Sequence, residues 1–319
     1  MANAAPSRVT VRATARLHLG FLDLHGGLGR RFGSLGMALD GPETRITLCR
    51  TDHAVVTGQE PVRAERILRQ LETALGLSGH ALEIAAGIPA HAGLGSGTQL
   101  ALAIGAAVRH LHGLEPTAQV DAALLGRGLR SGIGIALFTQ GGFVLDGGRG
   151  EATTTPPLLT RVPVPSDWRV LLLRDPGYQG LSGEQEKRAF RMLPPMGESD
   201  VGRICRLVLM QVVPALIEPD LPRFGGGITE IQRILGSHFA HAQGGLFASP
   251  RVGAALQWLE REGAMGIGQT SWGPSGFALT ASRADADHLL RALAVTPHAA
   301  GLLLSIHHPL NRGALIEAD

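Results

Sequence analysis

The residues best suited to chemistry in this chain form a glycine-rich turn at positions 89–99. We call it the glycine turn; an alanine-rich apolar segment follows at once and predicts a buried helix. Glycine tolerates positive φ, so neighbouring backbone N–H groups can converge, and a helix N-terminus adds unpaired donors and partial positive charge. We therefore expect a phosphate-sized anion site. A flexible helix start without a ligand is the alternative. The expected ligands are Gly93, Gly95, Ser96, Gly97 and Thr98.

A basic residue and an imidazole stand together at the end of an early strand pattern. Residues 9–17 alternate apolar and polar side chains, which predicts a strand and places Arg16 and His18 on one face. Such a pair suits a phosphate or a carboxylate. Asp23 follows as a candidate for sugar hydroxyls or magnesium. The alternative is an edge strand with solvated polar groups.

Residues 26–36 place five glycines around Arg30 and Arg31. This composition indicates a mobile cationic loop that clamps an anionic substrate and excludes water. A surface turn with solvated arginines is an equal alternative. A second glycine-rich turn, at 266–277, holds Trp272, one of three tryptophans. We interpret Trp272 as an aromatic platform for a flat ligand, or otherwise as a side chain packed under the turn.

Two other segments have candidate roles. Residues 131–143 predict a buried turn followed by a strand. Ser182 suits a helix cap. Asp175 and Glu186 are carboxylates to consider as cation partners or proton acceptors.

The composition indicates a globular protein, with 44% hydrophobic and 18% charged residues in a chain of 319. A net charge of +2 argues against a nucleic-acid partner. Two distant cysteines and the histidine spacing show no metal-ligand pattern, so we expect no protein metal site. We expect a cytoplasmic protein outside the membrane, because no run approaches the roughly 20 apolar residues of a membrane span and no signal pattern is visible.

Strand and helix patterns alternate along both halves of the chain, which predicts an α+β or α/β fold. Residues 153–157 are the best linker candidate. Strands are expected at 9–17, 45–49, 81–85, 168–173, 276–280 and 301–306, and helices at 64–75, 98–111, 118–125, 200–216, 224–240, 252–262 and 285–293.

Taken together, the motifs resemble the β-ribofuranosylaminobenzene 5'-phosphate synthases, a non-kinase branch of the GHMP kinase superfamily. The resemblance implies an α+β fold of two domains. The first, residues 1–160, would be like ribosomal protein S5 domain 2 and would carry the glycine turn. The second, residues 161–319, would be ferredoxin-like. The segments that carry the resemblance are 16–23, 29–36, 93–97, 180–183 and 269–274.

The resemblance also implies a reaction, in which phosphoribosyl pyrophosphate condenses with 4-aminobenzoate or 4-hydroxybenzoate. Carbon dioxide and pyrophosphate leave, and a C-riboside 5'-phosphate for methanopterin biosynthesis forms. Mg²⁺ would accompany the pyrophosphate, no organic cofactor is implied, and a homodimer is one open arrangement. Arg16, His18 and Arg30 or Arg31 would hold the 5'-phosphate or the carboxylate. Trp272 would stack on the ring, with Gln269 and Ser271 as polar neighbours.

Two positions depart from the pattern of the kinases in this superfamily. Where the kinases carry a catalytic aspartate, this chain has Gly134, and where they carry a second serine in the glycine turn, it has Gly97. Loss of an acid–base carboxylate and a metal-side hydroxyl disfavours phosphoryl transfer but leaves the phosphate cradle intact. An ATP-dependent small-molecule kinase and a non-catalytic protein that binds a phosphate ligand remain the alternatives.

Overall fold

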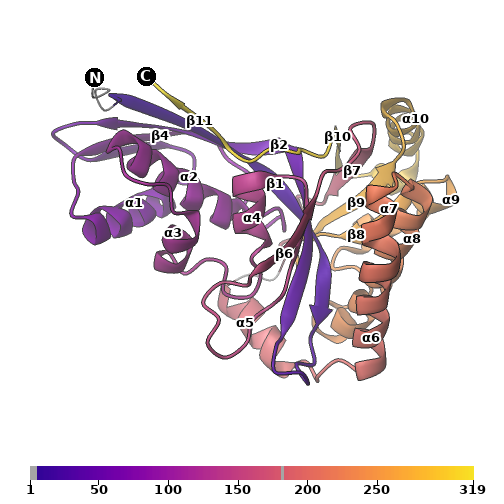
Figure 1. The fold of residues 1–319 in the computed structure, drawn as a ribbon. Coiled ribbons are helices and arrows are strands. Elements are labelled where there is room, and N and C mark those ends of the chain that lie inside the picture. Colours follow the sequence, from indigo (N-terminus) through magenta and orange to yellow (C-terminus); the bar gives the residue numbers. More distant parts are fainter. Residues whose placement is uncertain (1–5, 181–182) are drawn as a thin grey trace.

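The computed structural model describes residues 6–180 and 183–319, and it contains two β-sheets with helices packed against them (Figure 1). The first sheet is built on a long antiparallel hairpin, β1 (Arg8–Asp23) and β2 (Phe32–Arg50). On one side β1 pairs with β11 (Leu315–Ala318). On the other, β2 pairs with β4 (His80–Ala86), which is parallel to β3 (Val55–Gly58). The first residues of β2, 34–37, pair with β5 (Phe143–Asp146), and β5 pairs in turn with β6 (Leu158–Val162).

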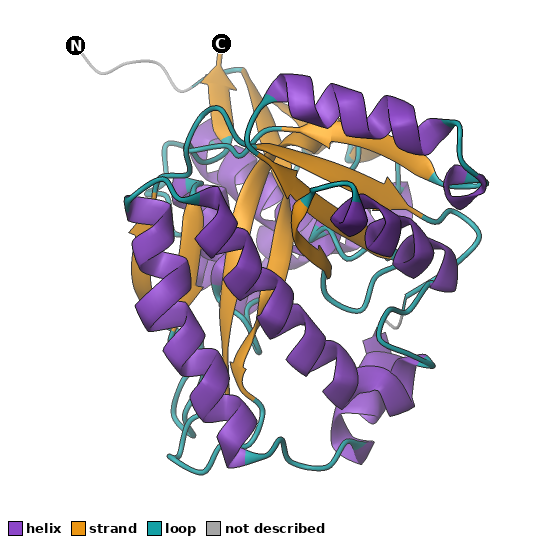
Figure 2. Ribbon diagram, turned by 90° about the vertical axis from the view of Figure 1, so that its right-hand side faces the viewer, coloured by secondary structure: helices purple, strands orange, loops and turns teal. Residues whose placement is uncertain are grey.

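The second sheet has four antiparallel strands in the order β10 (Leu303–His307), β7 (Arg169–Arg174), β9 (Ser275–Thr280), β8 (Met265–Gln269). Counted along the chain, this is the order fourth, first, third, second, which defines a ferredoxin-like sheet. Helices lie in front of the strands in the turned view of Figure 2. The prediction of a ferredoxin-like C-terminal half is confirmed.

Most helices begin and end within a few residues of the predicted bounds. The helix expected at 64–75 starts at a proline and ends at Gly76, which has the left-handed conformation that glycine favours. The helices are α1 (Pro61–Leu75), α2 (Ser96–Leu111), α3 (Ala118–Leu124), α4 (Ile133–Gln140), α5 (Gly183–Met192), α6 (Glu198–Leu207), α7 (Val213–Ile217), α8 (Leu221–Gln243), α9 (Pro250–Arg261) and α10 (Arg283–Ala294).

Two predictions of local structure were wrong. The single helix expected at 200–216 is interrupted by a π-helical turn, η1 (Val208–Val212). Pro214, which has no N–H to continue the α-helical ladder, lies two residues after it. The turn and strand expected at 131–143 are the helix α4 and the start of β5. The buried carboxylate of Asp146 accepts the N–H of Gly132 at 2.8 Å and thereby fixes the start of α4.

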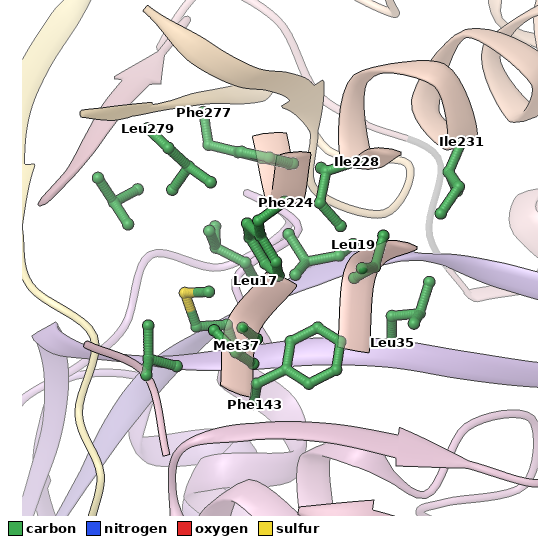
Figure 3. Close-up of a cluster of buried hydrophobic side chains, with 14 of the residues drawn as sticks. Leu17, Leu19, Leu35, Met37, Phe143, Phe224, Ile228, Ile231, Phe277 and Leu279 are labelled. Carbon is green, nitrogen blue, oxygen red and sulfur yellow. The ribbon is translucent and has the colours of Figure 1, made fainter. Parts of the chain in front are cut away.

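One hydrophobic core joins the two halves of the chain. Side chains of β1, β2 and β5 pack against side chains of α8 and β9 (Figure 3). The boundary predicted at residue 160 falls within β6, and β11 returns the C-terminus to the first sheet. The two halves therefore share their interior. The residues labelled in Figure 3 are Leu17, Leu19, Leu35, Met37, Phe143, Phe224, Ile228, Ile231, Phe277 and Leu279.

Candidate active site

A cleft with a volume of about 960 Å³ surrounds the glycine turn. Its walls come from the turn itself, from β1, from the first turns of α1, from the segment between α3 and α4, and from the loop after β8. Elements of both halves therefore meet at this cleft. Of the residues predicted to bind substrate, Arg16, His18, Gly93, Gly95, Ser96, Gly97, Thr98, Ser271 and Trp272 line it.

The glycine turn forms the start of α2 as predicted. Gly95 precedes the helix with φ of 86°, and its carbonyl accepts the N–H groups of Thr98 and Gln99 at 3.0 and 3.1 Å. The preceding N–H groups, of Ser96 and Gly97, have no acceptor of their own within a helix. The positive end of the 16-residue helix α2 is therefore available to an anion at the cleft.

Four arginines that the sequence reading did not single out line the same cleft. Arg63 and Arg66 come from α1, and Arg127 and Arg130 come from the segment before α4. Burial lowers the pKa of Arg127, and the charges of Arg63 and Arg66 lower it further. The second cause reflects repulsion among these guanidinium groups, which an anionic ligand would relieve.

Gly97 makes room for these arginines. A Cβ at this position would overlap Nη2 of Arg63 and would lie 3.2 Å from Nη1 of Arg127. Glu60 also lines the cleft. Its carboxylate oxygen Oε2 lies 2.9 Å from Nη1 of Arg63, so its charge is already paired. The absent side chain at 97 therefore allows guanidinium groups to reach the start of α2.

Arg16 and His18 reach the cleft from β1, between two irregularities in its pairing with β2. Nη1 of Arg16 donates to the carbonyl of Gly93 and so supports the glycine turn. His18 is buried, with 5% of its surface exposed. Burial, followed by the charges of Arg16 and Arg130, lowers its pKa to about 3. The imidazole is therefore neutral at physiological pH and does not contribute charge to an anion.

Thr270 links the two halves of the chain at this point. Its hydroxyl donates to the carbonyl of Gly93 at 2.8 Å and accepts the N–H of His18 at 2.9 Å. A Cβ on Gly93 would overlap the carbonyl oxygen of Thr270, so only glycine permits this approach. The loop after β8 thus holds the glycine turn against β1.

Trp272 lies in the wall of the cleft. Only 4% of its surface is exposed, and its ring packs against Phe239 at 4.5 Å and against Phe190 at 5.3 Å between centroids. Its neighbour Gln269 is fully engaged: it accepts the N–H of Ala248 and donates to Oε1 of Gln243, both within 2.9 Å. Most of the Trp272 ring is therefore covered by its neighbours, as in a side chain packed under the turn.

Three predicted contacts are not supported by their positions. Asp23 accepts the N–H of His25 at 2.7 Å and shapes the turn of the β1–β2 hairpin. Arg30 donates to the carbonyl of Gly147 at 2.9 Å, and Arg31 donates weakly to that of Leu24. None of the three lines the cleft. The hairpin is longer than the sequence indicated, because β1 continues to Asp23 and β2 begins at Phe32, so these residues lie at its tip and not in the cleft lining.

Asp175 also lies apart from the cleft lining. Asp175 accepts the hydroxyl hydrogen of Ser249 at 2.7 Å at the start of α9. Ser182 and the side chain of Glu186 lie outside the described residues. Within the described part of the chain, no group of three or more His, Cys, Asp or Glu side chains could hold a metal ion. No helix in that part is long and apolar enough to cross a membrane.

Comparisons with known proteins identify the class of this fold. Residues 62–142 match the GHMP kinases N terminal domain, and residues 212–296 match the GHMP kinases C terminal family. A homoserine kinase from Cytophaga hutchinsonii shares the fold with a TM-score of 0.68 over 99% of both chains, at 19% identity. Mevalonate kinase from L. major gives 0.72 over 97% of this chain and 99% of its own, at 16% identity. The chain thus has the fold of the GHMP kinase superfamily.

More similar relatives define the branch. A beta-ribofuranosylphenol 5'-phosphate synthase from Archaeoglobus fulgidus is 35% identical over 86% of this chain and 88% of its own length. The protein of the same name from Methanothermobacter thermautotrophicus is 31% identical over 85% and 88%. The chain belongs to the beta-ribofuranosylphenol 5'-phosphate synthase family. The predicted family and fold are confirmed.

Proposed function

We propose that this chain is an enzyme that joins phosphoribosyl pyrophosphate to a 4-substituted benzoate, with release of carbon dioxide and pyrophosphate, in methanopterin biosynthesis. The names of its relatives support a phenolic product, and we therefore favour 4-hydroxybenzoate over 4-aminobenzoate as the acceptor. The observation that carries the proposal is the arginine-lined cleft at the start of α2.

The cleft suits the phosphates of the donor. We place the diphosphate over the first turn of α2, where backbone N–H groups, Arg63 and Arg127 converge. Guanidinium groups bind phosphate oxygens through charge-assisted hydrogen bonds, and these strengthen in a partly desolvated cleft. Negative charge builds up on this group as it leaves, so the same contacts would stabilise the transition state.

The residues near the cradle favour attack at carbon over phosphoryl transfer. Gly134, where the related kinases carry a carboxylate, lies at the start of α4, and a Cβ there would be 3.1 Å from Cγ2 of Thr98. Glu60 is held by Arg63. The described groups at this position therefore bind anions and do not supply an aspartate to deprotonate an alcohol.

The proposed reaction balances without a protein base. The C–O bond between the ribose and the diphosphate breaks, and pyrophosphate leaves with the electron pair. The ring carbon that bears the carboxylate attacks the cationic ribosyl carbon, and the C–C bond to the carboxylate then breaks. Its electron pair restores aromaticity as carbon dioxide departs. The protein would orient the two substrates and exclude water.

Mg²⁺ would enter as part of the donor complex. Bound to the diphosphate, it would neutralise charge on the leaving group. The donor set on the protein side fits this arrangement, because the described part of the cleft offers arginines and backbone N–H groups, with Glu60 already paired. Arginines and a metal–diphosphate complex would then share the charge.

The decisive assay incubates the protein with phosphoribosyl pyrophosphate, Mg²⁺ and 4-hydroxybenzoate or 4-aminobenzoate labelled at the carboxyl carbon. We expect labelled carbon dioxide and pyrophosphate in equal amounts, with the higher kcat/KM for 4-hydroxybenzoate. A parallel reaction replaces the donor with ATP and a small alcohol. Phosphorylation of the alcohol without decarboxylation would assign the chain to the kinases instead.

A further inference from the structure

A second, smaller cavity lies beside the cleft. It has a volume of about 30 Å³, and it lies between α8, β1 and the loop after β8. We call it the annex. Its walls include His18, Phe21, Ser271 and Trp272, all of which also line the cleft, and Leu235 and Phe239 of α8. The two spaces therefore meet at a common wall.

Two polar atoms of that wall have no hydrogen-bond partner among the residues that the structure describes. Nε2 of His18 and Nε1 of Trp272 are both buried without one. Both side chains are at least nine-tenths buried, at 5% and 4% exposure. A buried polar atom without a partner is unfavourable, so a ligand that satisfies both atoms would gain binding energy. Both residues line the cleft and the annex, which makes this common wall the candidate position for that ligand group.

The chemical character of the pair is defined. Trp272 Nε1 is a donor only. His18 carries no charge at physiological pH, because burial and the neighbouring Arg16 and Arg130 lower its pKa to about 3. A neutral imidazole has one nitrogen that donates and one that accepts. With Nε2 of His18 as the accepting nitrogen, the pair suits a small neutral group that both donates and accepts hydrogen bonds.

We infer that the annex receives the para substituent of the aromatic acceptor, and that His18 and Trp272 bind this substituent and thereby select the acceptor. The inference rests on the proposed function. The ring itself would remain in the cleft beside Phe21, with its carboxyl-bearing carbon directed toward the donor. A hydroxyl that donates to His18 becomes more electron-rich, and the para carbon, which attacks the ribose, gains electron density.

The size of the annex limits the substituent. A cavity needs about 10–15 Å³ to hold one water molecule. The annex, at about 30 Å³, therefore has room for a hydroxyl or amino group. A methoxy group adds a methyl and lacks a hydrogen to donate. Gln232 and Gln243 also line the annex, but their amide groups are bound to the backbone of Leu19 and Gly245, so this wall is rigid.

The first test compares four acceptors: 4-hydroxybenzoate, 4-aminobenzoate, benzoate and 4-methoxybenzoate. Binding is measured by calorimetry with the acceptor alone, and turnover is measured by pyrophosphate release. We expect the first two to bind at least tenfold more tightly than the last two. His18→Phe and Trp272→Phe should remove this preference and raise the KM for 4-hydroxybenzoate about tenfold, while the KM for the donor changes less than twofold.

A gain-of-function variant keeps the test independent of lost activity. Leu235→Ala shortens a side chain of the annex wall and should admit 4-methoxybenzoate, with tighter binding than in the unmodified protein. Leu221→Ala is the matched control, because Leu221 is equally buried on α8 but does not line the annex. Thermal unfolding would verify that both variants are folded.

The outcomes separate the two proposals. Equal binding of 4-methoxybenzoate and 4-hydroxybenzoate by the unmodified protein, or no binding of any acceptor, would overturn the role of the annex. Decarboxylation of 4-hydroxybenzoate could still occur in that case and would leave the proposed reaction standing. Selective binding of 4-hydroxybenzoate without decarboxylation would support the role of the annex and contradict the proposed reaction.

Discussion

Arg16 and His18 project from the same strand, yet the structure gives them different charge states. Arg16 keeps its charge and supports the glycine turn through the carbonyl of Gly93. His18 is neutral, with a pKa of about 3, because of burial and two neighbouring arginines. The sequence suggests two cations side by side. In the structure, Arg16 is a cation that supports the glycine turn, and His18 is a neutral ring.

The neutral state of His18 predicts a contribution to acid instability. Its pKa is about 6.5 in the unfolded chain and about 3 in the folded protein, so the unfolded chain binds more protons between these values. The stability present above pH 6.5 is then lost as the pH falls, by up to about 1.4 kcal/mol per pH unit. In His18→Phe, urea unfolding at pH 7 and pH 5 should show a smaller loss of stability than in the unmodified protein. Equal losses in the two proteins would contradict the assignment.

The arginine cluster predicts the strength of donor binding. Arg127→Met removes a guanidinium from the start of α2 and should weaken binding of phosphoribosyl pyrophosphate about tenfold or more, since a hydrogen bond to a charged group contributes roughly 1.5–3 kcal/mol. Arg69→Met is the matched control, because Arg69 is an exposed residue of α1 paired with Glu65. Both variants lose one charge, so equal effects in calorimetry would indicate only a long-range field.

The sequence revealed part of the site because part of it is local. The glycine turn and the helix it starts are contiguous, and their residue types predict their geometry. Arg63 and Arg66 lie on the polar face of an amphipathic helix, where cleft-lining and solvated arginines have the same pattern. The spacing of Arg63, Arg66 and Arg69 at three residues was the available signal, since it places them near one face. Only the packing of α1 beside α2 separates the first two from the third.

At the scale of elements, the loop after β8 determines how the glycine turn is held. Thr270 bonds the turn and β1 at once, so Thr270→Val removes two hydrogen bonds. We expect about 1–3 kcal/mol lower stability and a higher KM for the donor. Thr270→Ser keeps the hydroxyl and should restore most of both. The measurements are urea unfolding and donor kinetics. An unchanged donor KM in the valine variant would show that this loop does not contribute to phosphate binding.

Gly97 offers a second prediction at this scale. A serine there would restore the hydroxyl of the related kinases, but its Cβ would overlap Arg63. We therefore expect Gly97→Ser to displace Arg63, to weaken donor binding and to confer no ATP-dependent phosphorylation, because Gly134 still lacks a carboxylate. Calorimetry with the donor and an ATP assay measure the two effects. Appearance of kinase activity would show that Gly97 alone separates the two chemistries.

Sequence patterns predicted the elements unevenly, and the reason is physical. The bounds of amphipathic helices such as α1 and α9 can be predicted from the spacing of their apolar residues and from the proline or glycine at their ends. Burial alternates along residues 8–16 of β1 and 44–49 of β2. Residues 17–21 of β1 and 33–39 of β2 are buried without interruption, on both faces of the sheet, so the alternation is lost there. The glycine-rich segment 26–36 therefore indicated a mobile loop, although β2 already begins within it, at Phe32.

For the whole molecule, the shared core predicts cooperative unfolding. Leu17 and Met37 of the first sheet pack in one cluster with Phe224 and Phe277 of the second half, and β11 closes the first sheet from the far end of the chain. Neither half can lose its structure without exposing the interior of the other. We expect one calorimetric transition, with a van't Hoff enthalpy close to the calorimetric enthalpy.

The same interdependence is tested by dividing the chain. A fragment of residues 1–160 would expose its share of the common core and would lack β11, so we expect no cooperative unfolding transition from it alone. Addition of a fragment of residues 161–319 should restore cooperative unfolding and donor binding together, because Thr270 and Trp272 complete the cleft. A stable isolated fragment that binds the donor as tightly as the intact chain would show that the phosphate cradle requires only the first sheet and its helices.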